Sequence, residues 1–130
     1  MTQLPVTLSS AAACALLNIW LGSRIARLRS QFKVSVGDGG HDLLLRRMRA
    51  QANFIENAPF VLMLLAGIEL WGGNRMALQA IAAIFILTRI AHPIGMDGPQ
   101  FRRWRMVGMI GSTIVTLALI AWALLLIAGY

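Results

Sequence analysis

The sequence predicts an all-α integral membrane protein whose four transmembrane helices form one bundle over residues 1–130. Apolar residues make up 58% of the chain, charged residues make up 13%, and the mean hydropathy is +0.68. A soluble domain of this size needs more polar surface than such a composition supplies. Four long apolar stretches alternate with polar ones, so the apolar residues are grouped into segments that fit a bilayer.

The first expected span covers residues 4–23. This stretch is uncharged and long enough to cross the hydrocarbon core of a membrane. No basic segment precedes it, so we expect a retained helix and not a cleaved signal peptide. Cys14, the single cysteine of the chain, lies in the middle of this span. We expect its thiol to pack as an unreactive apolar group.

The second expected span covers residues 43–71 and lies between two glycine-rich turns. Gly37-Asp38-Gly39-Gly40 predicts a turn before the helix, and Gly72-Gly73-Asn74 predicts a tight turn after it. Asp42 precedes the first apolar residues and is expected to cap the helix.

The third and fourth expected spans cover residues 76–96 and 104–128. The third span is interrupted by Arg89, and the sequence Asp97-Gly98-Pro99 breaks the chain after it. The fourth span is the clearest of the four, because it is uncharged from residue 106 onward.

The distribution of cations predicts the orientation in the membrane. Residues 24–49 hold seven cations and residues 102–105 hold three, whereas residues 72–75 hold one. Connections rich in arginine and lysine stay in the cytoplasm, so both termini are expected on the opposite side. Because the basic segments lie between apolar ones, we expect them to contact anionic lipid headgroups, and we expect no nucleic-acid partner.

A polar stripe enters the second span at its cytoplasmic end. Its members recur at steps of three and four residues: Arg46, Arg49, Asn53 and Glu56. This spacing places them on one face of a helix, and that face is expected to contact protein or water and not lipid. We expect Glu56 to be the deepest member and to pair with Arg49 or Arg89. Glu56→Leu is therefore expected to harm assembly or binding more than Glu69→Leu.

The charge balance around the stripe indicates the class of ligand. Arginines outnumber carboxylates there, so we expect an anionic ligand that enters from the cytoplasm, beside a hydrophobic second substrate from the lipid. A thiol ligand would be favoured as thiolate by nearby guanidinium groups. Pro59 and Pro93 are expected to bend their helices and open a cavity, and His92 adds a titratable group. No cluster has the spacing of metal ligands.

These residues resemble a known family. The run from Arg49 to Pro59, Arg-Ala-Gln-Ala-Asn-Phe-Ile-Glu-Asn-Ala-Pro, is similar to the second-helix signature of the MAPEG family, the membrane-associated proteins in eicosanoid and glutathione metabolism. Four further segments resemble its bacterial branch: 37–40, 69–72, 89–92 and 105–108. The similarity covers nearly the whole chain in order.

The resemblance implies a homotrimer that binds glutathione between neighbouring subunits, as a transferase or peroxidase of the microsomal type. It implies that Arg105 and Arg49 are catalytic, by stabilising the glutathione thiolate for attack on hydrophobic electrophiles or lipid hydroperoxides. It further implies that glutathione is held by Arg24 or Arg27, together with Arg49, Asn53, Glu56, Arg89 and His92. The bacterial branch implies an inner-membrane location, with periplasmic termini and a cytoplasmic site.

Two departures from the family pattern bear on the reaction. Met96 stands where eicosanoid-pathway members carry a tyrosine, and Ala52 stands where some members have another arginine. One alternative is a small four-helix multidrug exporter, although such exporters depend on an acid in the first helix and residues 1–23 contain none. Another alternative is a non-catalytic lipid-binding or scaffold protein with the same fold.

Overall fold

The computed structural model describes residues 3–129 as four long helices, one short helix and the turns between them. In chain order the elements are α1 (Pro5–Phe32), α2 (Asp42–Leu70), α3 (Arg75–Gly95), the 3-10 helix η1 (Pro99–Phe101) and α4 (Arg102–Ile127). Each of the four α-helices, the last taken with η1, is long and apolar enough to cross a membrane. The predicted fold class, an all-α membrane protein with four spans, is confirmed.

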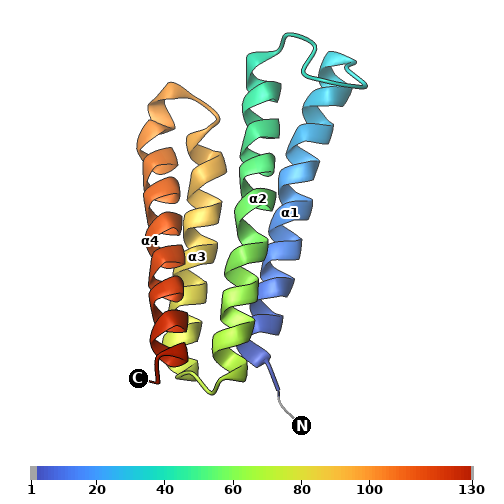
Figure 1. Ribbon diagram of the computed structural model, residues 1–130. Coiled ribbons are helices and arrows are strands. Elements are labelled where there is room, and N and C mark those ends of the chain that lie inside the picture. The colour runs from blue at the N-terminus through green and yellow to red at the C-terminus, as the bar shows by residue number, and fades with distance from the viewer. Residues whose placement is uncertain (1–2, 130) are drawn as a thin grey trace.

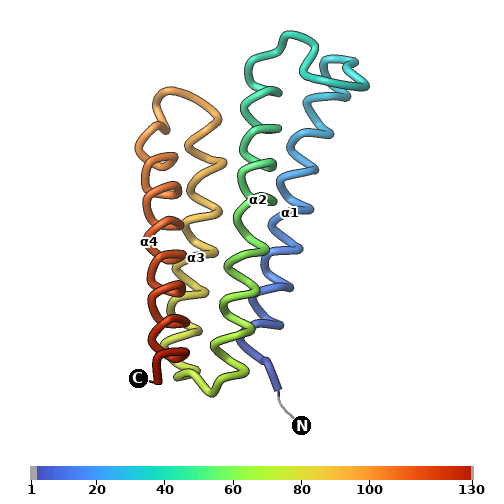
Figure 2. The backbone as a smooth tube through the Cα atoms, in the orientation of Figure 1, coloured from blue at the N-terminus to red at the C-terminus, as the bar shows by residue number. Residues whose placement is uncertain are grey.

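The four helices run side by side as two hairpins, α1 with α2 and α3 with α4 (Figure 1). Both termini lie at one end of the bundle, and the α1–α2 and α3–α4 connections lie at the other (Figure 2). We call the latter the basic end, because the two cation-rich connections meet there. The paired ends of α1 and α2 extend beyond the α3–α4 turn at the basic end.

The helix boundaries differ from the expected spans mainly at the basic end. The first helix continues past residue 23 to Phe32, where Lys33 closes it in the left-handed conformation with φ of 55°. Its charged last turns are amphipathic: Ile25 and Leu28 are buried against Leu44 of α2. Charge ends the part of a helix that fits hydrocarbon, but it does not end the helix itself.

Asp42 does not act as the expected cap of α2. The cap position is His41, which has extended backbone and makes no side-chain hydrogen bond to the helix. Asp42 is the first helical residue and instead pairs with Arg46 one turn later, at 3.2 Å. Its carboxylate still lies in the first turn, where negative charge suits the helix dipole.

The main core lies between the four helices. Its buried side chains come from all four helices and include Val6, Leu21, Phe54, Leu65, Leu78, Phe85 and Leu119. Cys14 is buried in the same cluster, as expected for a packing residue. Many large apolar side chains on the outer faces, such as Leu16, Leu87 and Leu124, are exposed, as suits a surface that faces lipid.

Small residues bring α3 and α4 together near the basic end. A Cβ atom added to Gly108 of α4 would lie 2.6 Å from the Cβ of His92, and one added to Gly111 would lie 2.5 Å from the Thr88 side chain. A Cβ on Gly95 of α3 would collide with the backbone of Arg105. Glycine at these positions therefore sets the distance between the two helices that carry His92 and Arg105.

At the terminal end, Glu69 ties α2 to the start of α1. Its carboxylate accepts hydrogen bonds from the backbone N–H groups of Val6 (2.9 Å) and Thr7 (2.8 Å) and from the Thr7 hydroxyl (2.8 Å). The N–H groups in the first turn of a helix have no partner within the helix, so Glu69 supplies one and also favours the dipole. Glu69 is thus a structural residue, and only 9% of its surface is exposed.

Candidate functional site

A buried polar cluster links α2, α3 and α4 towards the basic end. Its centre is the Arg89 guanidinium, which donates from Nη1 to the Ser112 hydroxyl (3.1 Å) and from Nη2 to the Asn53 side-chain oxygen (2.6 Å). Ser112 in turn donates to the carbonyl of Gly108 at 2.8 Å. Arg89 is only 2% exposed, so the helices enclose this cation completely.

The charge of Arg89 has no carboxylate partner among residues 3–129, because both of its acceptors are neutral. A buried, unbalanced guanidinium is expensive at membrane depth, and such groups are by default candidates for function. Two nitrogen atoms of the region are also buried without a hydrogen-bond partner, Nε of Arg89 and Nδ1 of His92. The cluster is therefore preformed and electropositive, with unused hydrogen-bonding capacity.

Other members of the predicted stripe face outward from the protomer. Arg49 and Glu56 are exposed on α2, and we call these two residues the outward pair. The expected ion pair of Glu56 with Arg49 or Arg89 is not formed in the described protomer. Glu69, which was expected to be the less sensitive of the two acids, is buried and hydrogen-bonded in the protomer, whereas Glu56 is exposed.

The basic end contains a small cavity rich in arginine. It encloses about 140 Å³ and is lined by Arg46, Gly95, Met96, Gly98, Pro99, Arg102 and Arg105. We call it the arginine pocket. It joins the start of α2 to the α3–α4 turn and the start of α4, and Arg105 is one of its lining residues. Arg102 was not among the predicted residues.

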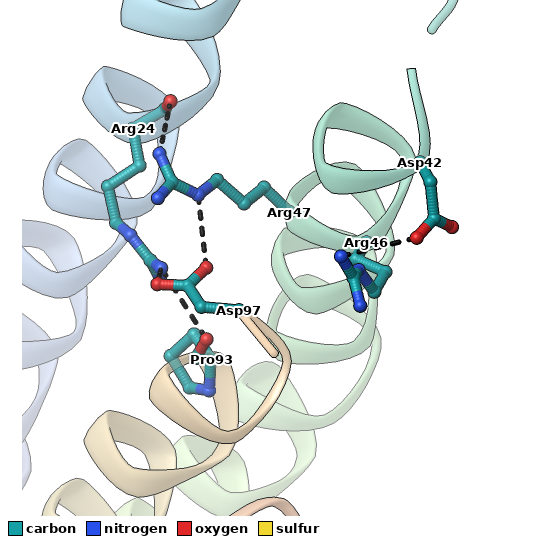
Figure 3. Close-up of polar contacts among 6 residues, drawn as sticks. All are labelled: Arg24, Asp42, Arg46, Arg47, Pro93 and Asp97. Atoms are coloured by element: carbon teal, nitrogen blue, oxygen red, sulfur yellow. Dashed lines mark hydrogen bonds and ion pairs between the residues drawn. The ribbon is translucent and has the colours of Figure 1, made fainter. Parts of the chain in front are cut away.

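Arg24 and Arg47 share one carboxylate, that of Asp97, in the turn after α3 (Figure 3). Arg24 contacts Oδ2 of Asp97, and Nε of Arg47 donates to Oδ1 at 3.0 Å. From the sequence, Asp97 was expected only to be part of a chain break. A carboxylate within a strongly basic connection was the available signal, since an isolated acid among cations has partners within reach.

The predicted residues thus divide into three groups. The first group lies in or beside the buried polar cluster and includes Asn53, Arg89 and His92. The second consists of exposed residues: Arg27, Arg49, Glu56 and Arg105. Arg24 forms the third group, because it is buried and engaged by Asp97. In the part of the chain that the structure describes, no group of three potential ligands gathers to hold a metal ion.

The family of this chain follows from its match to a family model. The model of the MAPEG family matches residues 7–125. The chain belongs to the MAPEG family. The matched residues reach from the first turn of α1 to the last turn of α4, so the match includes all four helices of the bundle.

Bacterial relatives of this MAPEG protein agree with that assignment. The chain is 30% identical over 99 residues to the inner membrane protein YecN of Escherichia coli (strain K12), covering 76% of this chain and 75% of the relative. The protein of the same name from Escherichia coli O6:H1 has the same identity and coverage.

Proposed function

We propose that this MAPEG protein is a glutathione-dependent enzyme of the bacterial inner membrane, a transferase or peroxidase that acts on hydrophobic substrates. The observation that carries the proposal is the excess of positive charge at the basic end. Among residues 3–129 Arg89 is buried without a carboxylate partner, and three further arginines line one cavity. Such a site favours an anionic ligand, and family membership favours glutathione among anionic ligands.

The chemistry of glutathione matches the residues available. The tripeptide carries two carboxylates, an ammonium group and a thiol. Guanidinium groups bind carboxylates with paired hydrogen bonds, which suits Arg46, Arg102 and Arg105 in the arginine pocket. Glu56 is the one carboxylate of the predicted stripe and suits the ammonium group. Asn53 adds a neutral amide at the edge of the buried polar cluster.

The proposed reaction begins with the thiol of glutathione. Arg105 and Arg49 stabilise its thiolate form, since a cation near sulfur favours the charged state. The thiolate sulfur then bonds to an electrophilic carbon and displaces its leaving group. With a lipid hydroperoxide the sulfur attacks the outer oxygen, an S–O bond forms as the O–O bond breaks, and the departing alkoxide takes a proton from water. The resulting glutathione sulfenic acid reacts with a second glutathione to give the disulfide and water. His92 and Arg89 line the site from α3.

The site is proposed to be complete only in an oligomer, which the family resemblance implies to be a homotrimer. The arginine pocket of about 140 Å³ is smaller than the roughly 300 Å³ at which pockets for small molecules begin. The outward pair is charged and exposed on a membrane-spanning helix, and a second copy would shield it from lipid. Of the two first-helix candidates, we propose that Arg27 contributes, because it is exposed while Arg24 is held by Asp97.

The orientation proposed for the bundle follows from its basic end. Both cation-rich connections lie there, so this end faces the cytoplasm and the termini face the periplasm. The exporter alternative is disfavoured by family membership and by Glu69, which is already used by three hydrogen bonds.

Calorimetric titration of the purified protein with glutathione tests the proposal. Wild type is expected to bind, and Arg105→Leu and Arg49→Leu are each expected to weaken binding by at least about tenfold, as when a charged hydrogen-bond partner is lost. Arg75→Leu is the matched control, because Arg75 starts α3 at the opposite end of the bundle. Absence of binding by wild type, or equal loss in all three variants, would contradict the proposal.

A further inference from the structure

We propose that Asp97 is the positioning residue of the candidate site: it holds the α3–α4 turn against α1 and α2 and so fixes the geometry of the arginine pocket. The identity of the ligand in this inference rests on the proposed function. The structural role of Asp97 rests on the contacts alone.

Asp97 joins three helices through two arginines (Figure 3). One carboxylate oxygen faces Arg24 of α1 and the other accepts from Nε of Arg47 of α2, at 3.0 Å. Arg47 also donates from Nη1 to the backbone carbonyl of Arg24, at 3.3 Å. The two arginines are therefore tied to each other as well as to Asp97. We call these three residues the Asp97 cluster.

Further contacts fix the guanidinium of Arg24. It lies over the Trp20 ring, 4.7 Å from the ring centroid, and Nη2 lies 3.5 Å from the carbonyl of Pro93. Pro93 lies in the last turn of α3, where carbonyl groups have no intrahelical N–H four residues further on, so an arginine can supplement the bonding of this carbonyl. Arg24 is only 8% exposed, which limits screening of its pair with Asp97 by water.

The neighbours of Asp97 form the arginine pocket. Met96 and Gly98, on either side of Asp97, both line it, and Arg102 and Arg105 follow on the first turns of α4. Arg46 lines it from α2, next to Arg47. The Asp97 cluster therefore connects the two sides of the pocket. A shift of the turn would move two of the three pocket arginines relative to the third.

Only a carboxylate offers one acceptor oxygen to each of the two arginines, Arg24 and Arg47. An asparagine has one acceptor oxygen, and its NH₂ group would point donor hydrogens at the other guanidinium. Asp97→Asn would leave one buried cation without its partner, whereas Asp97→Glu keeps two acceptor oxygens on a longer side chain. This difference predicts partial rescue by glutamate.

Two measurements on the full-length protein in micelles test the role of Asp97. The first is hydrogen exchange of the backbone amides of residues 96–101, which needs no ligand. The second is the dissociation constant for glutathione. Asp97→Asn is expected to speed exchange in this turn about tenfold or more and to weaken glutathione binding about tenfold, and Asp97→Glu is expected to recover part of both.

Two control variants separate positioning from other effects. Asp38→Asn makes the same charge change in the α1–α2 turn, where the Asp38 carboxylate accepts a hydrogen bond from the backbone N–H of Gly40. Glu69→Gln destabilises the bundle at its opposite end. Neither is expected to change the glutathione affinity. If Asp97→Asn does not fold, Arg47→Gln removes the more exposed ion pair together with the hydrogen bond to the Arg24 carbonyl, and it is expected to act in the same direction.

The outcomes are distinguishable. Unchanged exchange in residues 96–101 of Asp97→Asn would overturn the structural part of the inference, even if glutathione does not bind wild type. Faster exchange with unchanged affinity would overturn the positioning role. Failure of wild type to bind glutathione would overturn the proposed function, while the exchange experiment still decides whether Asp97 holds the turn.

Discussion

Asn53 of the buried polar cluster and the two residues of the outward pair belong to the same predicted stripe of α2, yet their side chains lie in different environments. Asn53 turns inward and bonds to Arg89, whose other partner comes from α4. Arg49 and Glu56 remain exposed. Packing within one chain thus gives Arg89 two neutral hydrogen-bond partners, but it gives this cation no carboxylate among residues 3–129. The outward pair is accessible to a ligand or a second copy.

The largest expected effect on stability comes from a change that disturbs the α3–α4 contact beside the buried polar cluster. Gly108→Ala places a methyl group 2.6 Å from the backbone nitrogen and Cβ of His92, so α4 must move away from α3. We expect the free energy of unfolding to fall by about 3 kcal/mol, as for an overpacked core. Denaturation in micelles measures it. Gly67→Ala is the control: nothing lies within 4 Å of its added Cβ, so stability is expected to stay equal or rise.

The second effect concerns Glu69, the buried acid at the opposite end of α2. Glu69→Gln removes the charge that two backbone N–H groups and one hydroxyl share. We expect a loss of about 2 kcal/mol in the free energy of unfolding, because hydrogen bonds to a charged group are stronger than neutral ones. Thermal unfolding checks this. A shift no larger than that of a surface variant would show that Glu69 does not secure the start of α1.

The third effect concerns Glu56 and is to be compared with that of Glu69. Glu56→Gln is expected to change the unfolding of the protomer by less than about 0.5 kcal/mol, since its side chain is exposed. It is expected instead to weaken self-association and glutathione binding. Native mass spectrometry of the oligomer provides the measurement. An unaltered oligomer with unaltered affinity would remove Glu56 from the proposed site.

The smallest effect is expected from loss of the exposed ion pair between Asp42 and Arg46, at the basic end. Asp42→Asn breaks the contact with Arg46, in which the Asp42 side chain is 77% exposed. Such pairs contribute about 0.3 kcal/mol, so unfolding should barely change. Because Arg46 lines the arginine pocket, removal of the nearby negative charge should slightly strengthen glutathione binding. Titration at low and high salt checks this, and the gain should fade at high salt.

Much of the fold could be predicted from sequence patterns that lie within a single helix or turn. Apolar length predicted the four spans, and glycine-rich runs predicted the turns. The three-and-four spacing of polar residues predicted that Asn53 and its neighbours share a face. The α1 extension to Phe32 was missed, because charge was taken as the end of the helix, whereas Ile25 and Leu28 continue its buried face.

The contacts that sequence reasoning missed join residues far apart in the chain. Asp97 meets Arg24 and Arg47 across three helices, and Glu69 meets Thr7 at the start of α1. Such partners depend on how helices are rotated against each other, which the α3–α4 glycines help to set. The pattern on α2 fixed which residues share a face, but it did not fix which side of that face meets a neighbouring helix.

The most direct test of the central claim is the ultraviolet difference absorbance of glutathione mixed with the purified protein at neutral pH. A bound thiolate gives a signal that free glutathione, which is mostly protonated there, does not give. We predict this signal for wild type, and its loss in Arg105→Leu at glutathione concentrations that still saturate the variant. Glutathione bound by wild type without a thiolate signal, or an equal signal in Arg105→Leu, would contradict an arginine-activated glutathione site.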